Sequence, residues 1–199
     1  MTSLPLMESF YTLQGEGFHT GKPAYFVRLG GCDVGCHWCD VKESWDKDLH
    51  PTVSESAIVE EVVNVGAKHV VITGGEPLMY NLDSLTAELR KRDVSVHLET
   101  SGVYPLSGTW DWICFSPKKF KKPREEFYQI SDELKIVIFN RSDFKWSLEH
   151  GEKMNKKAHL FVQPEWSKEA EVLPGLLQFV KNNQHWRVSL QTHKYMNIP

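Results

Sequence analysis

Long apolar runs and abundant cysteine are what this sequence lacks. Only four of its 199 residues are cysteine, three of them within eight residues, and in a reducing compartment such a cluster indicates metal binding rather than disulfides. Met1–Phe10 holds no basic stretch followed by a long apolar one, so we expect neither a signal peptide nor a membrane span. The formal net charge is only −3, which argues against a broad surface for nucleic acid. These absences favour a cytoplasmic protein that acts on small polar molecules.

Composition and residue pattern indicate an α/β fold in one domain. Hydrophobic residues make up 41% of the chain and charged residues 25%, as is usual for a globular protein. The length allows one sizeable core but is short for a complete eight-fold α/β barrel. Short apolar strands alternate with helical periodicity, which implies a parallel sheet. Since no repeat, low-complexity tract or linker is evident, we expect residues 1–199 to form a single domain.

The expected strands are short and end in polar loops. Parallel sheets and barrels bind their ligands beyond the C-terminal ends of the strands, so these loops are where we expect the site. The first helix begins at a capping box formed by Thr52 and Glu55, and Pro174 opens the last helix. We expect strands at 24–29, 70–72, 94–98, 112–115, 134–139, 158–163 and 187–190, and helices at 53–65, 82–89 and 174–182.

Three cysteines directly follow the first of these strands. Cys32, Cys36 and Cys39 have the spacing Cys-x3-Cys-x2-Cys, which lets three thiolates hold one face of a 4Fe-4S cluster. Three ligands leave the fourth iron open, and an open metal position can bind a reactant. The loop therefore predicts a metal centre that takes part in chemistry.

A structural zinc site is the alternative interpretation of this loop. Such a site normally has four ligands, so it would have to recruit His19, His37 or Cys114. Cys114 lies in the apolar stretch 112–115, where a small buried side chain is the commoner role. We therefore leave Cys114 out of the cluster.

The cysteine spacing, with Trp38 just before the third cysteine, resembles that of the radical S-adenosylmethionine (SAM) superfamily. In that superfamily the amino and carboxylate groups of SAM chelate the open iron. The reduced cluster then cleaves the sulfonium, and the resulting 5'-deoxyadenosyl radical removes a hydrogen from the substrate. The resemblance implies that the protein's own task is to position cofactor and substrate and to exclude water.

Other strand ends resemble segments that contact the cofactor in this superfamily. The string 73–77, Thr-Gly-Gly-Glu-Pro, alone would be a tight turn, but its glycines also let a ligand approach the backbone. The resemblance assigns Gly75, and less directly Glu76, to the methionyl amino group. The residues that it implies for cofactor binding are Trp38, Asp40, Gly75, Glu76, Ser116, Pro117, Lys118, Gln163, Pro164, Glu165 and Trp166.

The basic run from Lys118 to Arg124 has a plainer interpretation than nucleic-acid binding. A charge run is usually a solvated face, so we assign a functional role to Lys118 alone.

Nearly the whole chain resembles the 7-carboxy-7-deazaguanine synthases of queuosine and deazapurine biosynthesis. The most specific features are Gln-Gly-Glu-Gly at 14–17, a strand arginine at 28, the cysteine loop and the tail 190–199. The resemblance implies a lyase that converts 6-carboxy-5,6,7,8-tetrahydropterin to 7-carboxy-7-deazaguanine with loss of ammonia, and the product can serve tRNA modification or another deazapurine. It also implies an incomplete, modified (β/α) barrel, a homodimer, and an electron donor such as flavodoxin.

The substrate residues follow from the same resemblance and from side-chain chemistry. Arg28 offers a planar bidentate donor for the substrate carboxylate, and a structural ion pair is its alternative role. Glu16, or the backbone of residues 13–15, can accept hydrogen bonds from the amino edge of the pterin. The residues expected to contact substrate are Leu13, Gln14, Gly15, Glu16, Arg28, Thr73, His193 and, through its terminal carboxylate, Pro199.

Val41 departs from the family pattern. Family members often have threonine directly after the Cys-Asp pair as a magnesium ligand, and a valine side chain cannot bind the ion. Magnesium dependence is therefore in doubt, since Mg²⁺ would have to bind through substrate and backbone oxygens.

A glycyl-radical-enzyme activase is the nearest rival function, because it uses the same cluster. It abstracts hydrogen from a polypeptide and needs a groove for one, whereas Gln14–Gly17 favours the synthase. A noncatalytic zinc-binding module is the rival from another class.

Overall fold

Nine strands form the framework of the computed structural model, which describes residues 2–199 and leaves Met1 outside the description. The strands predicted from the sequence are all present, and that at 112–115 has the expected bounds. Two further strands, near the N-terminus and before the first helix, were not predicted. The strands are β1 (Ser3–Leu13), β2 (Pro23–Leu29), β3 (Thr52–Ser54), β4 (His69–Gly74), β5 (Ser95–Thr100), β6 (Trp112–Phe115), β7 (Glu133–Ile138), β8 (His159–Pro164) and β9 (Trp186–Val188).

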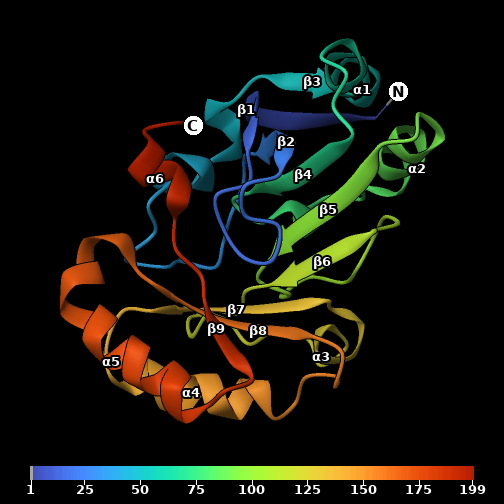
Figure 1. The fold of residues 1–199 in the computed structure, drawn as a ribbon. Coiled ribbons are helices and arrows are strands. Elements are labelled where there is room, and N and C mark those ends of the chain that lie inside the picture. The colour runs from blue at the N-terminus through green and yellow to red at the C-terminus, as the bar shows by residue number, and fades with distance from the viewer. Residues whose placement is uncertain (1) are drawn as a thin grey trace.

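These strands form one curved sheet in the order β3-β1-β2-β4-β5-β6-β7-β8-β9. Pairing is antiparallel among β3, β1 and β2 and parallel from β2 through β9. Over residues 2–199 the sheet does not close, since β3 and β9 are its two edges (Figure 1). The expected α/β class and incomplete barrel are thus confirmed.

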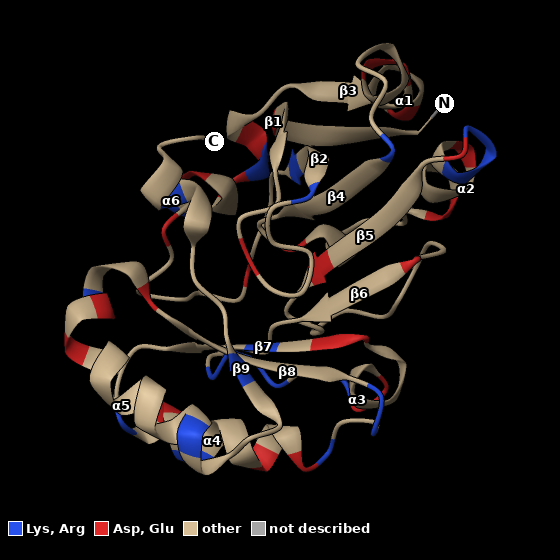
Figure 2. Cartoon of the chain, in the orientation of Figure 1, with Lys and Arg blue, Asp and Glu red and all other residues tan. Residues whose placement is uncertain are grey.

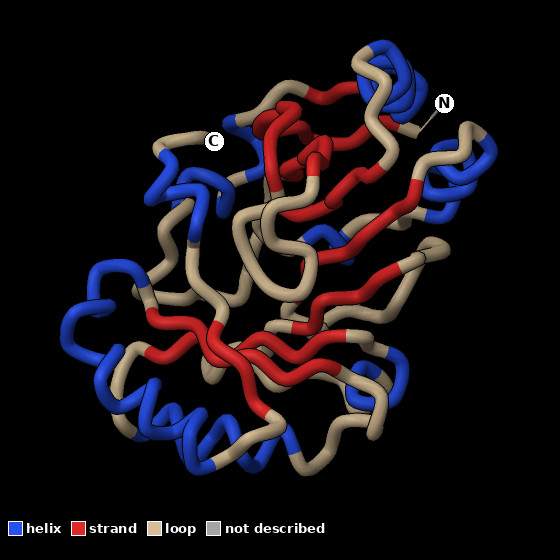
Figure 3. Tube along the Cα trace, in the orientation of Figure 1, coloured by secondary structure: helices blue, strands red, loops and turns tan. Residues whose placement is uncertain are grey.

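In the described part of the chain, six α-helices accompany the sheet, and Figures 1 and 3 show the larger ones around its outer side. In the view of Figure 2, acidic and basic residues are interspersed over these outer helices. Within residues 2–199, no helix has both the length and the apolar character needed to cross a bilayer. The helices are α1 (Glu55–Asn64), α2 (Asp83–Lys91), α3 (Phe127–Ile130), α4 (Ser142–Gly151), α5 (Glu169–Asn182) and α6 (Thr192–Met196).

The predicted capping box at the first helix is wrong. The cap is Ser54, whose side chain accepts a hydrogen bond from the Ala57 amide at 3.3 Å. Thr52 instead lies in β3, opposite Pro5 of β1. Pairing with β1 keeps residues 52–54 extended, so the helix starts later than the sequence motif indicates.

The predicted start of the last long helix is also wrong. Pro174 lies inside α5, which begins five residues earlier at Glu169. The acidic first turn suits a helix N-terminus, and the buried Val172 and Leu176 continue one apolar face across the proline. Burial of that face outweighs the backbone hydrogen bond that proline cannot donate.

Side-chain alternation along the strands separates the core from the site. In β7, Leu134, Ile136 and Ile138 are fully buried in the hydrophobic core, while Lys135 and Val137 line a cavity on the opposite face. In β2, Val27 and Leu29 join the core whereas Phe26 and Arg28 line the same cavity. The core thus holds the strands that aim polar side chains at the concave side.

Candidate functional site

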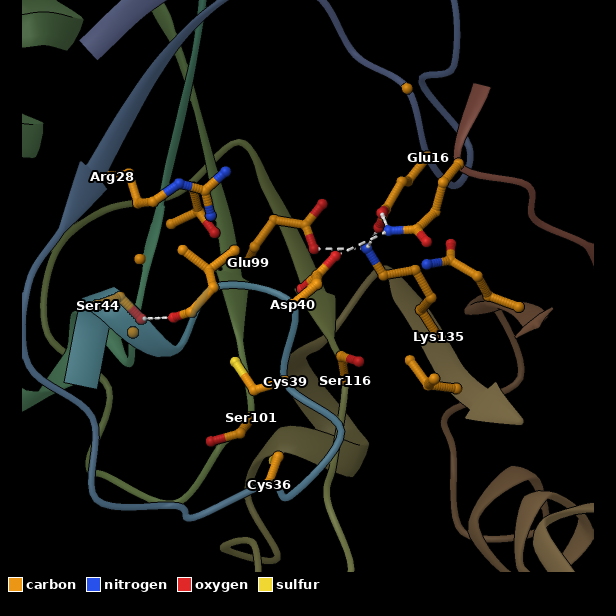
Figure 4. Close-up of a pocket in the computed structure, with 18 of the residues that line it drawn as sticks. Glu16, Arg28, Cys36, Cys39, Asp40, Ser44, Glu99, Ser101, Ser116 and Lys135 are labelled. Carbon is orange, nitrogen blue, oxygen red and sulfur yellow. Dashed lines mark hydrogen bonds and ion pairs between the residues drawn. The ribbon is translucent and has the colours of Figure 1, made fainter. Parts of the chain in front are cut away.

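A cavity of about 270 Å³ lies at the C-terminal ends of the parallel strands. Its lining comes from the loop after β1, from β2, from the cysteine loop, from the ends of β4 to β8 and from the C-terminal tail. Figure 4 shows side chains from these segments converging on it. The cavity thus lies beyond the C-terminal ends of the strands, where a site was expected from the sequence.

All three motif cysteines line this cavity as free thiols. The loop is fixed by backbone hydrogen bonds from Cys32 to Trp45 and from Cys39 to Cys36. Burial raises the pKa of Cys36 to about 11 and also raises that of Cys32. These thiols therefore hold their protons until a metal displaces them.

The loop fits a cluster better than a single ion. No three His, Cys, Asp or Glu side chains within residues 2–199 are arranged to hold one metal ion. The thiolates of a cubane each bind a different iron, so they need not converge on one point. Three thiols facing one open cavity match that requirement.

The side chains that zinc would have to recruit lie outside the main cavity lining. Cys114 is 3% exposed, as expected, and its thiol lies 3.6 Å from Glu133 Oε1. His37 packs edge-on against Phe120 and Phe139, and His19 packs against Trp112 and His97.

Gly75 lies where the loop after β4 docks against the segment before Cys32. Its amide donates to the carbonyl of Leu29 at 3.0 Å, and the next amide donates to that of Gly31 at 2.8 Å. A Cβ on Gly75 would overlap the Gly31 carbonyl and the Cys32 side chain. Only glycine allows this close approach, so Gly75 lets the loop after β4 pack directly against the backbone that carries Cys32.

Glu76 is placed differently from its predicted cofactor role. The residue is 1% exposed and outside the cavity lining, as is Pro117. Its carboxylate accepts hydrogen bonds from the Thr100 hydroxyl at 2.6 Å, the Ser101 amide at 2.8 Å and the Leu78 amide at 3.1 Å. In this structure the Glu76 side chain therefore ties the loop after β4 to the end of β5.

Replacing Glu76 with Ala is expected to lower the free energy of unfolding by roughly 2–4 kcal/mol, because several buried donors lose their acceptor. Urea unfolding followed by circular dichroism measures this. Glu60→Ala, on the exposed side of α1, is the matched control and is expected to be within about 0.5 kcal/mol of wild type. Equal midpoints for the two variants would contradict a structural role for Glu76.

A partly buried ion triad forms the far end of the cavity, and two of its members, Glu99 and Lys135, were not predicted from the sequence. Lys135 is 4% exposed, and its Nζ lies 2.5 Å from Glu16 Oε2 and 2.7 Å from Glu99 Oε2 (Figure 4). Burial raises the pKa of Glu16, but the Lys135 charge and hydrogen bond outweigh burial and hold that pKa well below its usual range. The available signal was a lone lysine inside an otherwise apolar strand.

Arg28 lies across the cavity from Lys135 (Figure 4). Its Nε donates to Glu8 Oε1 at 2.6 Å, so the structural ion pair weighed for this residue exists. Among residues 2–199, the hydrogen bonds of this guanidinium engage only Nε, which leaves its terminal nitrogens for a ligand. The ion pair and a carboxylate-binding role are compatible.

The C-terminal tail forms one wall of the site. His193 and Pro199 line the cavity, and Gln191, not predicted, donates to Glu16 Oε1 at 2.9 Å. Lys194 lies 2.8 Å from Asp40 Oδ2, just after the third cysteine. The tail thus holds both the acidic end and the cysteine loop.

The remaining segments predicted for cofactor binding line the cavity as a group. Lys118 Nζ donates to the Ser116 hydroxyl at 2.6 Å, and Gln163 Oε1 accepts from the Ser189 hydroxyl at 2.7 Å. Val41 also lines the cavity, with its carbonyl accepting from Ser44 Oγ at 2.7 Å. The predicted residues that line the cavity are Leu13, Gln14, Gly15, Glu16, Arg28, Cys32, Cys36, Trp38, Cys39, Asp40, Thr73, Gly75, Ser116, Lys118, Gln163, Pro164, Glu165, Trp166, His193 and Pro199.

The rest of the basic run is solvated, as expected. Lys121 and Arg124 form ion pairs with Asp33 and Glu126 at the protein surface, and Lys119 pairs with the buried Asp143.

This chain is similar to known proteins over nearly its whole length. The family described as "Radical SAM superfamily" matches residues 26–122. The 7-carboxy-7-deazaguanine synthase of Flavobacterium psychrophilum is 57% identical over 98% of this chain and 93% of its own length. That of Synechocystis sp. is 43% identical over 98% of this chain and 94% of its own. The crystal structure of QueE from Escherichia coli matches with a TM-score of 0.85 at 31% identity, covering 94% of this chain and 93% of that one.

Proposed function

Since the chain belongs to the 7-carboxy-7-deazaguanine synthases of the radical SAM superfamily, we propose that its cavity binds a 4Fe-4S cluster, SAM and the pterin side by side. The enzyme converts 6-carboxy-5,6,7,8-tetrahydropterin to 7-carboxy-7-deazaguanine with loss of ammonia, a reaction of queuosine biosynthesis. The observation that carries the residue assignments is that three motif thiols, Arg28 and Glu16 face one cavity. Near-full-length similarity to synthases leaves the activase and the zinc module without support.

Cys32, Cys36 and Cys39 would hold the cluster. When bound, the reduced cluster and SAM supply radical hydrogen abstraction from the substrate. Around them, the Gly75 backbone would accept the methionyl amino group, and Lys118 with Gln163 would orient the rest of the cofactor. Val41 offers magnesium no side-chain ligand, so the protein would contribute only backbone oxygens to such an ion.

The two ends of the cavity carry opposite charges, which orients the substrate. Arg28 would bind the carboxylate of the pterin through its terminal nitrogens. Glu16 and the backbone of residues 13–15 would accept hydrogen bonds from the pterin amino edge. Thr73, His193 and the end of the tail at Pro199 would close the pocket and exclude water from the radical.

The wider biological setting belongs to the same proposal and rests on the family. We propose that the whole chain acts as a single domain, forms a homodimer and works in the cytoplasm. A low-potential one-electron donor such as flavodoxin would reduce the cluster.

An anaerobic assay tests the function directly. The reconstituted protein is mixed with dithionite, SAM and the pterin, and mass spectrometry detects 7-carboxy-7-deazaguanine. Product supports both the radical chemistry and the substrate assignment. Formation of 5'-deoxyadenosine alone would overturn the substrate assignment, and neither product from an iron-loaded protein would overturn the function.

Replacing Arg28 with Ala is expected to raise KM for the pterin roughly tenfold to a hundredfold, the worth of a charge-assisted hydrogen bond. The cluster spectrum should not change. Glu8→Gln is the matched control, since it removes the ion pair but keeps the guanidinium. If Glu8→Gln and Arg28→Ala raised KM equally, Arg28 would act through the ion pair and the carboxylate assignment would be wrong.

A further inference from the structure

The cation Lys135 lies between the two carboxylates at the acidic end of the cavity, Glu16 and Glu99. Lys135 comes from the middle of β7, Glu99 from the end of β5 and Glu16 from the loop after β1. Lys135 is nearly inaccessible to solvent, so its charge acts on these two carboxylates rather than on water. The ion pairs with Lys135 therefore hold the side chains of Glu16 and Glu99 in place.

Several titratable or charged groups face this triad from neighbouring elements. Burial raises the pKa of the Cys114 thiol well above its usual range, so β6 contributes a neutral group. Burial lowers the pKa of His193 on α6, which keeps that ring neutral near pH 7. Burial raises the pKa of Glu133 on β7 to about 7, and that carboxyl lies outside the main cavity lining. Lys118, after β6, is a second cation of the cavity lining, and Lys194 pairs with Asp40, a carboxylate whose charge acts on Glu16.

Without Lys135, two partly buried carboxylates would lie close together with no cation between them. Like charges in such a site share a proton, and one of the two pKa values rises steeply. With Lys135 present, the end of the cavity holds two acceptors and a net charge of about −1 from the triad. That charge complements the N–H donors of an aminopyrimidine ring and repels a carboxylate.

We infer that Lys135 is a positioning residue that holds Glu16 and Glu99 as two fixed anionic acceptors, and thereby sets the orientation of the pterin between them and Arg28. This inference rests on the proposed function and deepens it. Lys135 donates to both carboxylates, so its proposed role is indirect. Its effect reaches the pterin through the positions and protonation states of the two carboxylates.

The test uses the full-length reconstituted enzyme with Lys135→Met, Lys135→Arg and the double variant Lys135→Met/Glu99→Gln. Calorimetry gives the Kd of the pterin in the presence of SAM, and turnover gives KM and kcat at pH 6, 7 and 8. Lys135→Met should weaken pterin binding at least tenfold, and more strongly at pH 8 than at pH 6, since a proton taken up by the carboxylate pair as pH falls brings its net charge back to about −1. Wild type should show a flatter profile over this range.

Charge compensation separates positioning from packing. Removing the charge of Glu99 from the Met variant restores a net charge of about −1, so the double variant should bind the pterin more tightly than Lys135→Met. Lys135→Arg keeps the cation and should retain most binding. Lys145→Met, an exposed lysine on α4, should behave as wild type.

Several results would overturn the inference. They are unchanged pterin binding in Lys135→Met, a loss that is the same at each pH, or a double variant weaker than the single one. Cluster absorbance and melting temperature, measured on the same samples, identify a loss caused by misfolding, and Lys135→Arg then decides the matter through its pH profile. Because binding is measured separately from turnover, a failure of the proposed reaction in wild type is distinguishable from a failure of this inference.

Discussion

Replacement of Cys36 with Ala is expected to remove the iron-sulfur absorbance of the reconstituted protein and all formation of 7-carboxy-7-deazaguanine. Among residues 2–199, the cavity lining contains no cysteine besides Cys32, Cys36 and Cys39. No other thiol there can take the place of Cys36. A cluster held by two thiolates would have a second exposed iron and would be lost. Iron analysis, the visible spectrum and the anaerobic product assay measure the result.

Cys114→Ala is the matched control for this experiment. Cys114 is equally a buried cysteine, but it lies at the back of the triad and outside the main cavity lining. The variant should keep its cluster and most of its activity. A Cys36→Ala protein that still bound four irons, or a Cys114→Ala protein that lost them, would contradict the ligand assignment.

Replacement of Gly75 with Ala is expected to lower kcat/KM roughly a hundredfold or more, although it adds a single methyl group. The new Cβ would meet the Gly31 carbonyl and Cys32, both parts of the chain that hold the first cluster ligand. The Gly75 amide donates a hydrogen bond to the Leu29 carbonyl, so this backbone cannot easily move away. A displacement of about 1 Å at a reacting centre is enough to cost about 10²-fold in rate.

The readouts for Gly75→Ala are iron content, SAM binding and product formation. Gly175→Ala is the control, because its Cβ inside α5 would meet only the Phe144 ring at 3.4 Å, an ordinary contact. Alanine also favours a helix over glycine by about 1 kcal/mol, so this control should melt at or above the wild-type temperature. Full cluster content and activity in Gly75→Ala would show that the loop has room that the structure does not indicate.

Much of the fold could be predicted from the sequence, because the strands carry local signals. The apolar run at 112–115 is bounded by polar residues, and β6 has those bounds. β1 was missed because Pro5 and Glu8 interrupt its pattern, and the strand is held by its antiparallel pairing with β2. Long-range pairing of this kind leaves little trace in a short window of sequence.

Some residues of the candidate site could likewise be predicted from the sequence, and others could not. The cysteine loop is contiguous, so its spacing alone indicated a cluster. Glu99 and Lys135 are 36 positions apart and meet only because β5 and β7 present them to one face of the sheet. Glu76 shows the opposite case, in which a motif residue was visible but its side chain turned inward to hold the loop.

The cavity also joins segments from opposite parts of the chain, which bears on the order of folding. Gly17 donates its amide to the hydroxyl of Ser189, 172 positions later, and the Gly15 carbonyl accepts from Thr192. Closing so long a loop carries an entropic cost and slows folding. On the ribosome, the cysteine loop and β4 are made well before residues 189–192. The half of the cavity that would hold the cluster can therefore fold before residues 189–192, which complete the acidic half, have been synthesised.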